Sequence, residues 1–129
     1  RRYGLTAAGT VNSPELTENL KYLFQDAKKT AVCAVNDEID PVAVVEVLRE
    51  KTKEITEWQA VPAPLLAQES VLILRQADAV LLVVPAGMHV GKPLEYVLEF
   101  LKTQDVTVTA ALLWNADEAL IRSYYLQYR

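Results

Sequence analysis

Residues 79–85 read AVLLVVP, an unbroken apolar run that follows Asp78 and precedes a loop at 87–91 that begins and ends with glycine. A run of this length without alternating polar residues is typical of a strand buried on both faces, as in the centre of a parallel sheet. Parallel strands need long crossover connections, which are usually helices. The stretch therefore predicts an α/β fold in which the rest of the chain covers both faces of the sheet.

The chain on either side of this run alternates between helical and extended patterns. Helices are expected at 14–28, 41–53, 65–76, 92–103 and 116–126, and further strands at 30–35, 56–61 and 106–114. Strands that alternate with helices of roughly 10 to 15 residues indicate βαβ units. The predicted fold is thus three-layered, with a mostly parallel sheet and helices on both faces.

Length and composition limit the class of protein. The 129 residues suit one domain, which we place at 13–129, and residues 1–12 read as a leader or linker because they contain two glycines and no clear period. The net charge is −4 and charges of both signs are interspersed, which disfavours a nucleic-acid surface. No apolar run reaches the roughly 18 residues of a membrane span. The single cysteine, Cys33, lies in a predicted buried strand and reads as a core residue in a reducing compartment.

A strand, a short polar turn and a helix start follow one another at 30–42, which is the layout of a phosphate-binding loop. Such a loop needs glycines that let backbone N–H groups wrap the phosphates, a lysine, and a Ser/Thr that holds Mg²⁺. The turn and helix start here read NDEIDPV: Asp40 is placed to cap the helix, Pro41 has no N–H, and Val42 has no hydroxyl. The sequence therefore predicts that this loop does not bind nucleotide phosphates.

The same edge of the sheet leaves a second possibility open. Ligands bind outside the carboxyl ends of the strands in open α/β sheets. Polar side chains that could converge there are Asp37, Glu38, Asp40, His89 and Asn115. A small-ligand or metal binder, or an enzyme that reuses this crevice, is the alternative that these residues leave open.

Three tyrosines, Tyr124, Tyr125 and Tyr128, lie within five residues near the C-terminus. One interpretation is a final helix that lays one or two rings on the core. The other is a phosphorylatable or partner-contacting tail, in which each phosphate would add a charge of roughly −1.5 to −2.

Several strings, in this order, resemble the cytoplasmic domain of bacterial tyrosine kinases (BY-kinases), which belong with the chain-length-determinant proteins of capsule and exopolysaccharide synthesis. The strings are YGLTAAGTV at 3–11, SPE at 13–15, AKKT at 27–30, SVLILRQADAVLLVV at 70–84, PAG at 85–87 and ALLWN at 111–115. The resemblance covers nearly the whole chain and extends to the tyrosine-rich end. It implies a reduced P-loop NTPase-like fold. Relatives of the partition and septum-site ATPases, which share the broader architecture, are a further possibility.

The departures from this family are informative. Aligned without gaps, Val35 and Asp40 stand where the phosphate loop has glycine, Pro41 replaces its lysine and Val42 its Ser/Thr. Ala60 and Val61 stand where the family has the Asp-Thr of its Mg²⁺-binding motif, so the ligands of the metal ion are missing as well. The family's second acidic strand motif is deleted. Every catalytic element is missing, so the resemblance implies a pseudo-enzyme without a nucleotide or metal cofactor.

The expected function follows from the resemblance. We expect a non-catalytic domain of a polysaccharide chain-length determinant that works through protein–protein contacts, either self-association or docking of an active kinase or the synthesis machinery. The expected location is the inner face of the cell membrane, as part of a longer membrane protein. Arg1 and Arg2 suit a juxtamembrane position of residues 1–12.

Overall fold

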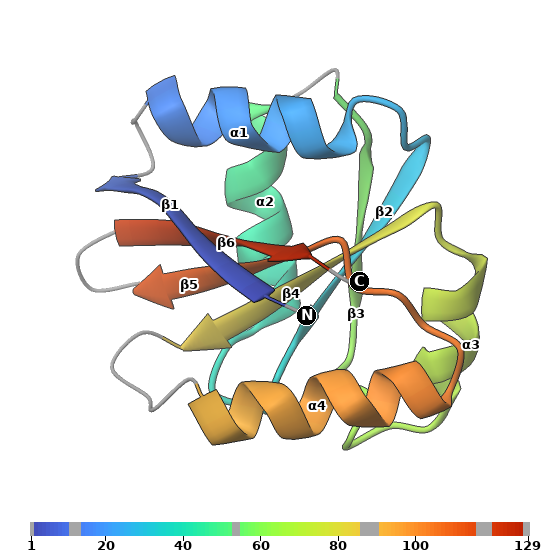
Figure 1. Ribbon diagram of the computed structural model, residues 1–129. Helices are drawn as coiled ribbons and strands as arrows, with labels where there is room; N and C mark the ends of the chain where they lie inside the picture. Colours follow the sequence, from blue (N-terminus) through green and yellow to red (C-terminus); the bar gives the residue numbers. More distant parts are fainter. Residues whose placement is uncertain (1, 11–13, 53–54, 86–90, 116–119, 128–129) are drawn as a thin grey trace.

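The computed structural model describes residues 2–10, 14–52, 55–85, 91–115 and 120–127. These residues form one six-stranded mixed sheet in the order β1-β6-β5-β4-β2-β3 (Figure 1). The strands are β1 (Arg2–Thr10), β2 (Lys29–Ala34), β3 (Glu57–Val61), β4 (Ala79–Pro85), β5 (Ala110–Asn115) and β6 (Leu120–Gln127). The helices are α1 (Pro14–Phe24), α2 (Pro41–Lys51), α3 (Glu69–Gln76) and α4 (Gly91–Thr103).

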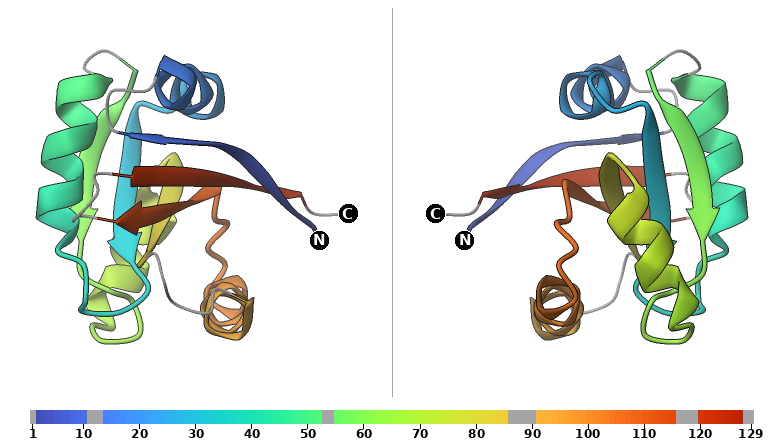
Figure 2. Two further views of the ribbon diagram at one scale, coloured as in Figure 1. Left: turned by 90° about the vertical axis from the view of Figure 1, so that its left-hand side faces the viewer. Right: turned by 90° about the vertical axis from the view of Figure 1, so that its right-hand side faces the viewer.

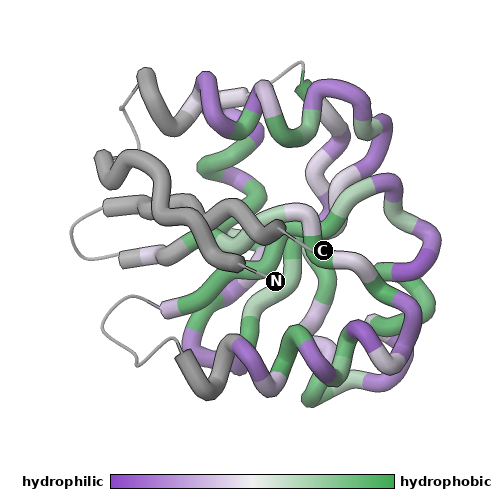
Figure 3. Tube along the Cα trace, in the orientation of Figure 1, coloured by the Kyte–Doolittle hydropathy of each residue, from purple (hydrophilic) through white to green (hydrophobic). Residues whose placement is uncertain are grey.

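Four of the strands, β3, β2, β4 and β5, run parallel, and β6 and β1 add an antiparallel extension. The predicted α/β class with a parallel sheet is confirmed. The run at 79–85 is β4, which lies between β2 and β5 and is buried at all seven positions. Figure 3 shows the same pattern as green along the central strands.

Alternate residues of the central strands enter two separate hydrophobic clusters, one on each face of the sheet. In β4, Val80, Leu82 and Val84 belong to one cluster, which α3 and α4 cover. Ala79, Leu81 and Val83 belong to the other, which α1 and α2 cover. The helices therefore lie on both faces, as the edge-on views of Figure 2 show.

The order of the parallel strands explains which helix covers which face. The chain moves from β2 outward to β3 through α2, and then back across β2 to β4 through α3. Crossovers between parallel strands are right-handed, so a reversal of direction places the next helices on the opposite face. This is one of the two common doubly wound orders, and it puts the switch point between β2 and β4.

Two predictions at the chain ends are wrong. The predicted helix at 116–126 is replaced, within the described residues, by strand β6, which pairs antiparallel with β5 on one side and β1 on the other. The predicted leader at 1–12 contains β1, an edge strand of the same sheet. Segment 120–127 contains β-branched and aromatic residues, which favour strands: Ile121, Tyr124 and Tyr125. Hydrogen bonding of β6 to a strand on each side outweighs the helix-like spacing of its apolar residues.

Smaller boundary differences have local causes. Helix α1 ends at Phe24 and not at 28, and α2 ends at Lys51. Helix α3 begins at Glu69 because Leu66 and Ala67 both donate backbone N–H groups to the carbonyl of Ala63 and form a separate turn.

Strand β5 begins at Ala110 rather than at 106 because of how α4 ends. Asp105 has a left-handed φ of 61°, and Val106 donates its N–H back to the carbonyl of Leu101. This arrangement is typical of a helix C-terminus, and it uses residues 106–109 to return to the sheet.

A charge at the centre of β4 should unfold the domain. Val83 is fully buried, and we expect Val83→Asp to cost several kcal/mol, because the carboxylate would have no partner in the apolar cluster. Val42→Asp is the matched control, since Val42 is 52% exposed in the first turn of α2, where a negative charge is tolerated. Urea denaturation followed by circular dichroism measures both, and a Val83→Asp protein as stable as the control would contradict the central position of β4.

Candidate functional site

The crevice at the carboxyl ends of the strands was the predicted place for a site. Helix α2 starts there, directly after the turn at 36–40 that follows β2. The loop at 86–90, which includes His89, lies outside the described residues. Of the two loops expected to form a site at this edge, the β2–α2 turn is the one that the structure describes.

Several N–H groups of this turn and of the helix start that follows it are hydrogen-bonded within the chain. The Asn36 side-chain oxygen accepts a hydrogen bond from the N–H of Glu38 at 2.9 Å. The Asp40 carboxylate accepts one from the N–H of Val42 at 3.0 Å, which makes Asp40 the N-cap of α2 as predicted. The Asp40 carbonyl accepts from Ala43 and Val44 at 3.1 and 3.3 Å.

Residues 41–44 at the start of α2 consequently have no free backbone N–H for an anion. The first four N–H groups of a helix have no partner within the helix and are what binds phosphate at such sites. Here Pro41 has none, and those of Val42, Ala43 and Val44 are donated to Asp40. The Asp40 carboxylate also places negative charge at the positive end of the helix.

The other positions aligned with the phosphate and Mg²⁺ motifs are parts of the sheet and its core. Val35 is buried, and its N–H donates to the carbonyl of Val83 at 3.0 Å. Val61 is fully buried in β3, and Ala60 beside it is half-buried. In the pairing of β2 with β3, Val61 lies next to Cys33 and Ala60 lies next to Val32.

The residues expected to converge at the crevice do not form a metal-binding group in the part of the chain that the structure describes. Asp37, Glu38 and Asp40 are exposed in one turn, and Asn115 ends β5, which is separated from β2 by β4. Among the described residues, no group of three or more His, Cys, Asp or Glu side chains could hold a metal ion.

Two of the three predicted tail tyrosines lie inside the sheet. Tyr124 pairs with Leu5 of β1 and Ala111 of β5, and Tyr125 pairs with Gly4 and Ala110 in the same two strands. Their backbone is not part of a free tail or of a final helix. Tyr128 lies outside the described residues, and phosphorylation or partner contact at any of the three remains a prediction.

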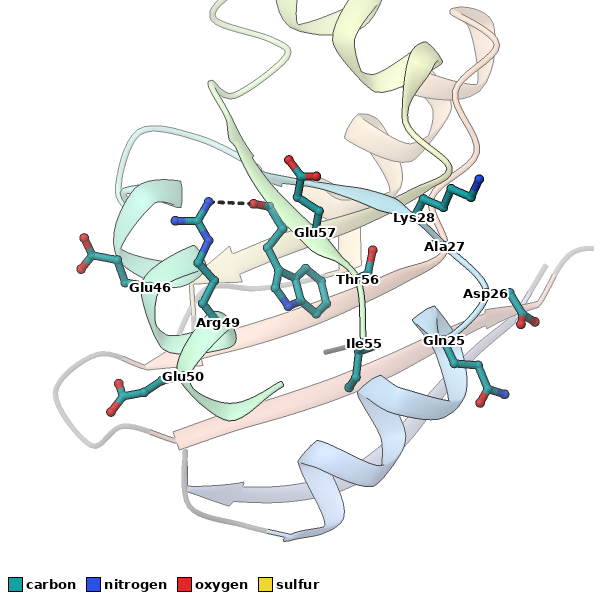
Figure 4. Close-up of a pocket in the computed structure, with 11 residues that line it drawn as sticks. Gln25, Asp26, Ala27, Lys28, Glu46, Arg49, Glu50, Ile55, Thr56 and Glu57 are labelled. Carbon is teal, nitrogen blue, oxygen red and sulfur yellow. Dashed lines mark hydrogen bonds between the residues drawn. The ribbon is translucent and has the colours of Figure 1, made fainter. Parts of the chain in front are cut away.

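A different feature, which the sequence did not indicate, lies at the opposite end of the parallel strands. An open groove of about 1130 Å³ is lined by three separate segments (Figure 4). They are the connection from α1 to β2, the second half of α2, and the chain that leads into β3. The lining residues are Gln25, Asp26, Ala27, Lys28, Glu46, Arg49, Glu50, Ile55, Thr56, Glu57 and Trp58.

Trp58 forms a fixed floor beneath this groove. Its ring is 1% exposed and lies edge-on to Phe24, with ring centroids 5.4 Å apart and an interplanar angle of 67°. Its indole N–H donates to the Thr52 hydroxyl at 2.8 Å, and that hydroxyl donates to the carbonyl of Leu48 at 2.5 Å. A buried, fully hydrogen-bonded tryptophan of this kind holds α2 against β3 in one position.

Among the described residues, most of the charged side chains around the groove have no ionic partner. Arg49 donates from its guanidinium to the carbonyl of Trp58 at 3.2 Å, the contact drawn in Figure 4. No hydrogen bond or ion pair to another described residue is found for the four carboxylates that line the groove, those of Asp26, Glu46, Glu50 and Glu57. Among the lining residues that the structure describes, Lys28 and Arg49 are the cations, so negative groups outnumber positive ones by two.

Comparison with known proteins identifies no relative: no protein-family model matches the chain, and neither the curated proteins nor the solved structures contain a match. Among the described helices, none is long and apolar enough to cross a membrane.

Loss of the Asp40 cap should destabilise the domain modestly. We expect Asp40→Ala to lower the free energy of unfolding by about 1 kcal/mol, because the Val42 N–H loses its acceptor. Asp37→Ala in the same turn is the control, since the Asp37 carboxylate is exposed and caps nothing. Equal unfolding free energies for the two variants, measured with urea, would show that the cap contributes no stability.

Cys33 should be unreactive in the folded protein. Burial raises the pKa of its thiol to about 12, so almost no thiolate exists near neutral pH, and the side chain is fully enclosed in β2. We expect a disulfide reagent at pH 8 to label Cys33 only as fast as the domain opens. Rapid stoichiometric labelling, at the rate seen in urea, would contradict this burial.

Proposed function

We propose that this chain is a non-catalytic, BY-kinase-like domain that acts through protein–protein contacts. The observation that carries the proposal is the closed start of α2, where Asp40 accepts every N–H that the first turn has to offer. A domain that binds ATP must leave these donors free for phosphate. The same turn is rich in acidic residues, which would repel phosphate charge.

The chemistry of phosphoryl transfer supports the same proposal. That reaction depends on positioning and on stabilisation of charge by a lysine, Mg²⁺ and backbone donors. Pro41 and Val42 supply neither the ammonium group nor the hydroxyl, and Ala60 and Val61 have no side-chain oxygen that could hold Mg²⁺. The domain would keep the sheet and helices of a nucleotide-binding protein without their ligand.

The resemblance of the ordered sequence strings suggests the setting. We place the domain in a capsular or exopolysaccharide chain-length determinant, as a reduced P-loop NTPase-like domain at the cytoplasmic face of the membrane. Its partners would be a second copy, an active kinase or the polysaccharide synthesis machinery. The net charge of −4 favours protein over nucleic acid as a partner.

Nucleotide titration tests the proposal. We expect isothermal calorimetry with ATP or ADP, with and without Mg²⁺, to show no binding at millimolar nucleotide, because residues 41–44 offer no free backbone N–H and the turn before them is acidic. The double variant Asp40→Ala, Pro41→Gly is the companion measurement, since it frees the first turn of α2. Micromolar nucleotide binding by the unmodified protein, retained in the double variant, would contradict the proposal that this loop does not bind phosphate. It would favour the alternative, a small-ligand binder or an enzyme.

A further inference from the structure

We propose that the groove between α1, α2 and β3 docks a segment of a partner protein in which lysine or arginine residues flank an apolar side chain. The inference rests on the proposed function as a protein-binding domain, and it names the surface and the chemistry of the partner. It uses none of the positions aligned with the phosphate or Mg²⁺ motifs.

The shape of the groove suits a polypeptide. Its volume of about 1130 Å³ is above the roughly 300 to 1000 Å³ of a typical small-molecule pocket, and the groove is open rather than enclosed. Half-buried Ala27 and Ile55 provide apolar surface beside the Trp58 floor. This surface is fixed before binding by the Phe24 and Thr52 contacts of Trp58, so docking would order little of this chain.

The charge of the groove selects a cationic partner. Glu46 and Glu50 lie on α2 at one side and Asp26 at the other, with Ile55 between them in Figure 4. A polar, charged rim around an apolar centre is the usual anatomy of a protein interface. Arg49 donates one hydrogen bond to the Trp58 carbonyl and keeps its positive charge, so it offsets one of the four carboxylates among the described lining residues.

The helix ends add to the same preference. Helix α1 ends at Phe24, directly before the lining residues 25–28, and α2 ends at Lys51, directly after Glu50. The C-terminus of a helix carries a partial negative charge, which attracts cations. Two helix C-termini and an excess of carboxylates therefore act in the same direction at this groove.

A second groove on the opposite face lacks this combination. It lies between α3 and α4, has a volume of about 360 Å³ and is lined by Gln68, Val71, Leu72, Arg75, Phe100 and Gln104. Arg75 is its only charged group and is hydrogen-bonded to the carbonyl of Gln104 at 2.6 Å. Nothing there specifies the chemistry of a partner.

Fluorescence anisotropy with a labelled peptide tests the inference. The probe is a short fluorescein-labelled peptide of alternating lysine and leucine, and its counterpart has glutamate in place of lysine. We expect the lysine peptide alone to bind, and Glu46→Gln combined with Glu50→Gln to weaken binding about five-fold. The control combines Glu69→Gln with Glu95→Gln, which removes the same charge from exposed positions on the helices of the opposite face and should leave the affinity unchanged.

The outcomes separate this inference from the proposed function. Equal weakening by both double variants would mean that the peptide senses only net charge, and would overturn the groove as the docking site. Absence of lysine-peptide binding would overturn it as well. Neither result touches the non-catalytic role, which is judged by nucleotide titration of the same preparation. Selective loss in the Glu46, Glu50 variant supports the groove.

Discussion

The burial of β4 on both faces is the constraint on which the rest of the structure depends. A strand that is apolar at every position must be covered twice, and it must be paired on both edges, because unpaired backbone groups in a core are costly. Strands β2 and β5 supply the pairing, while Val80 and Leu81, neighbours in sequence, enter opposite clusters. The two layers of helices, one on each face of the sheet, follow from this one requirement.

Much of the fold could be predicted because its signals are local. The apolar run at 79–85 and the Asp40-Pro41 helix start depend on residues that are close in sequence, and both are found in the structure. The predictions for the two chain ends were wrong because the structure there depends on residues that are distant in sequence. Strand β1 pairs with β6, which lies more than 100 residues away in sequence, and β6 also pairs with β5; no local sequence pattern reports such partners.

The candidate site shows the same division. The capped start of α2 could be predicted from Asp40 and Pro41 alone, since a cap and a missing N–H are properties of single residues. The groove could not, because it brings together residues 25–28, the end of α2 and the start of β3, none of which forms a motif. The one residue that could have pointed to it is Trp58, within the strand predicted at 56–61, because a buried tryptophan needs a covering element and a hydrogen-bond partner.

The two ends of a parallel α/β sheet differ in charge by construction. Helices that follow strands begin at the carboxyl edge and bring partial positive charge there, and helices that precede strands end at the amino edge with partial negative charge. Most such folds exploit the first end for anions. Here the Asp40 carboxylate offsets the partial positive charge at the start of α2, whereas Glu46 and Glu50 add negative charge near the end of the same helix. The proposed absence of phosphate binding at α2 and the proposed preference of the groove for cations would both follow from where this sequence places its acidic residues.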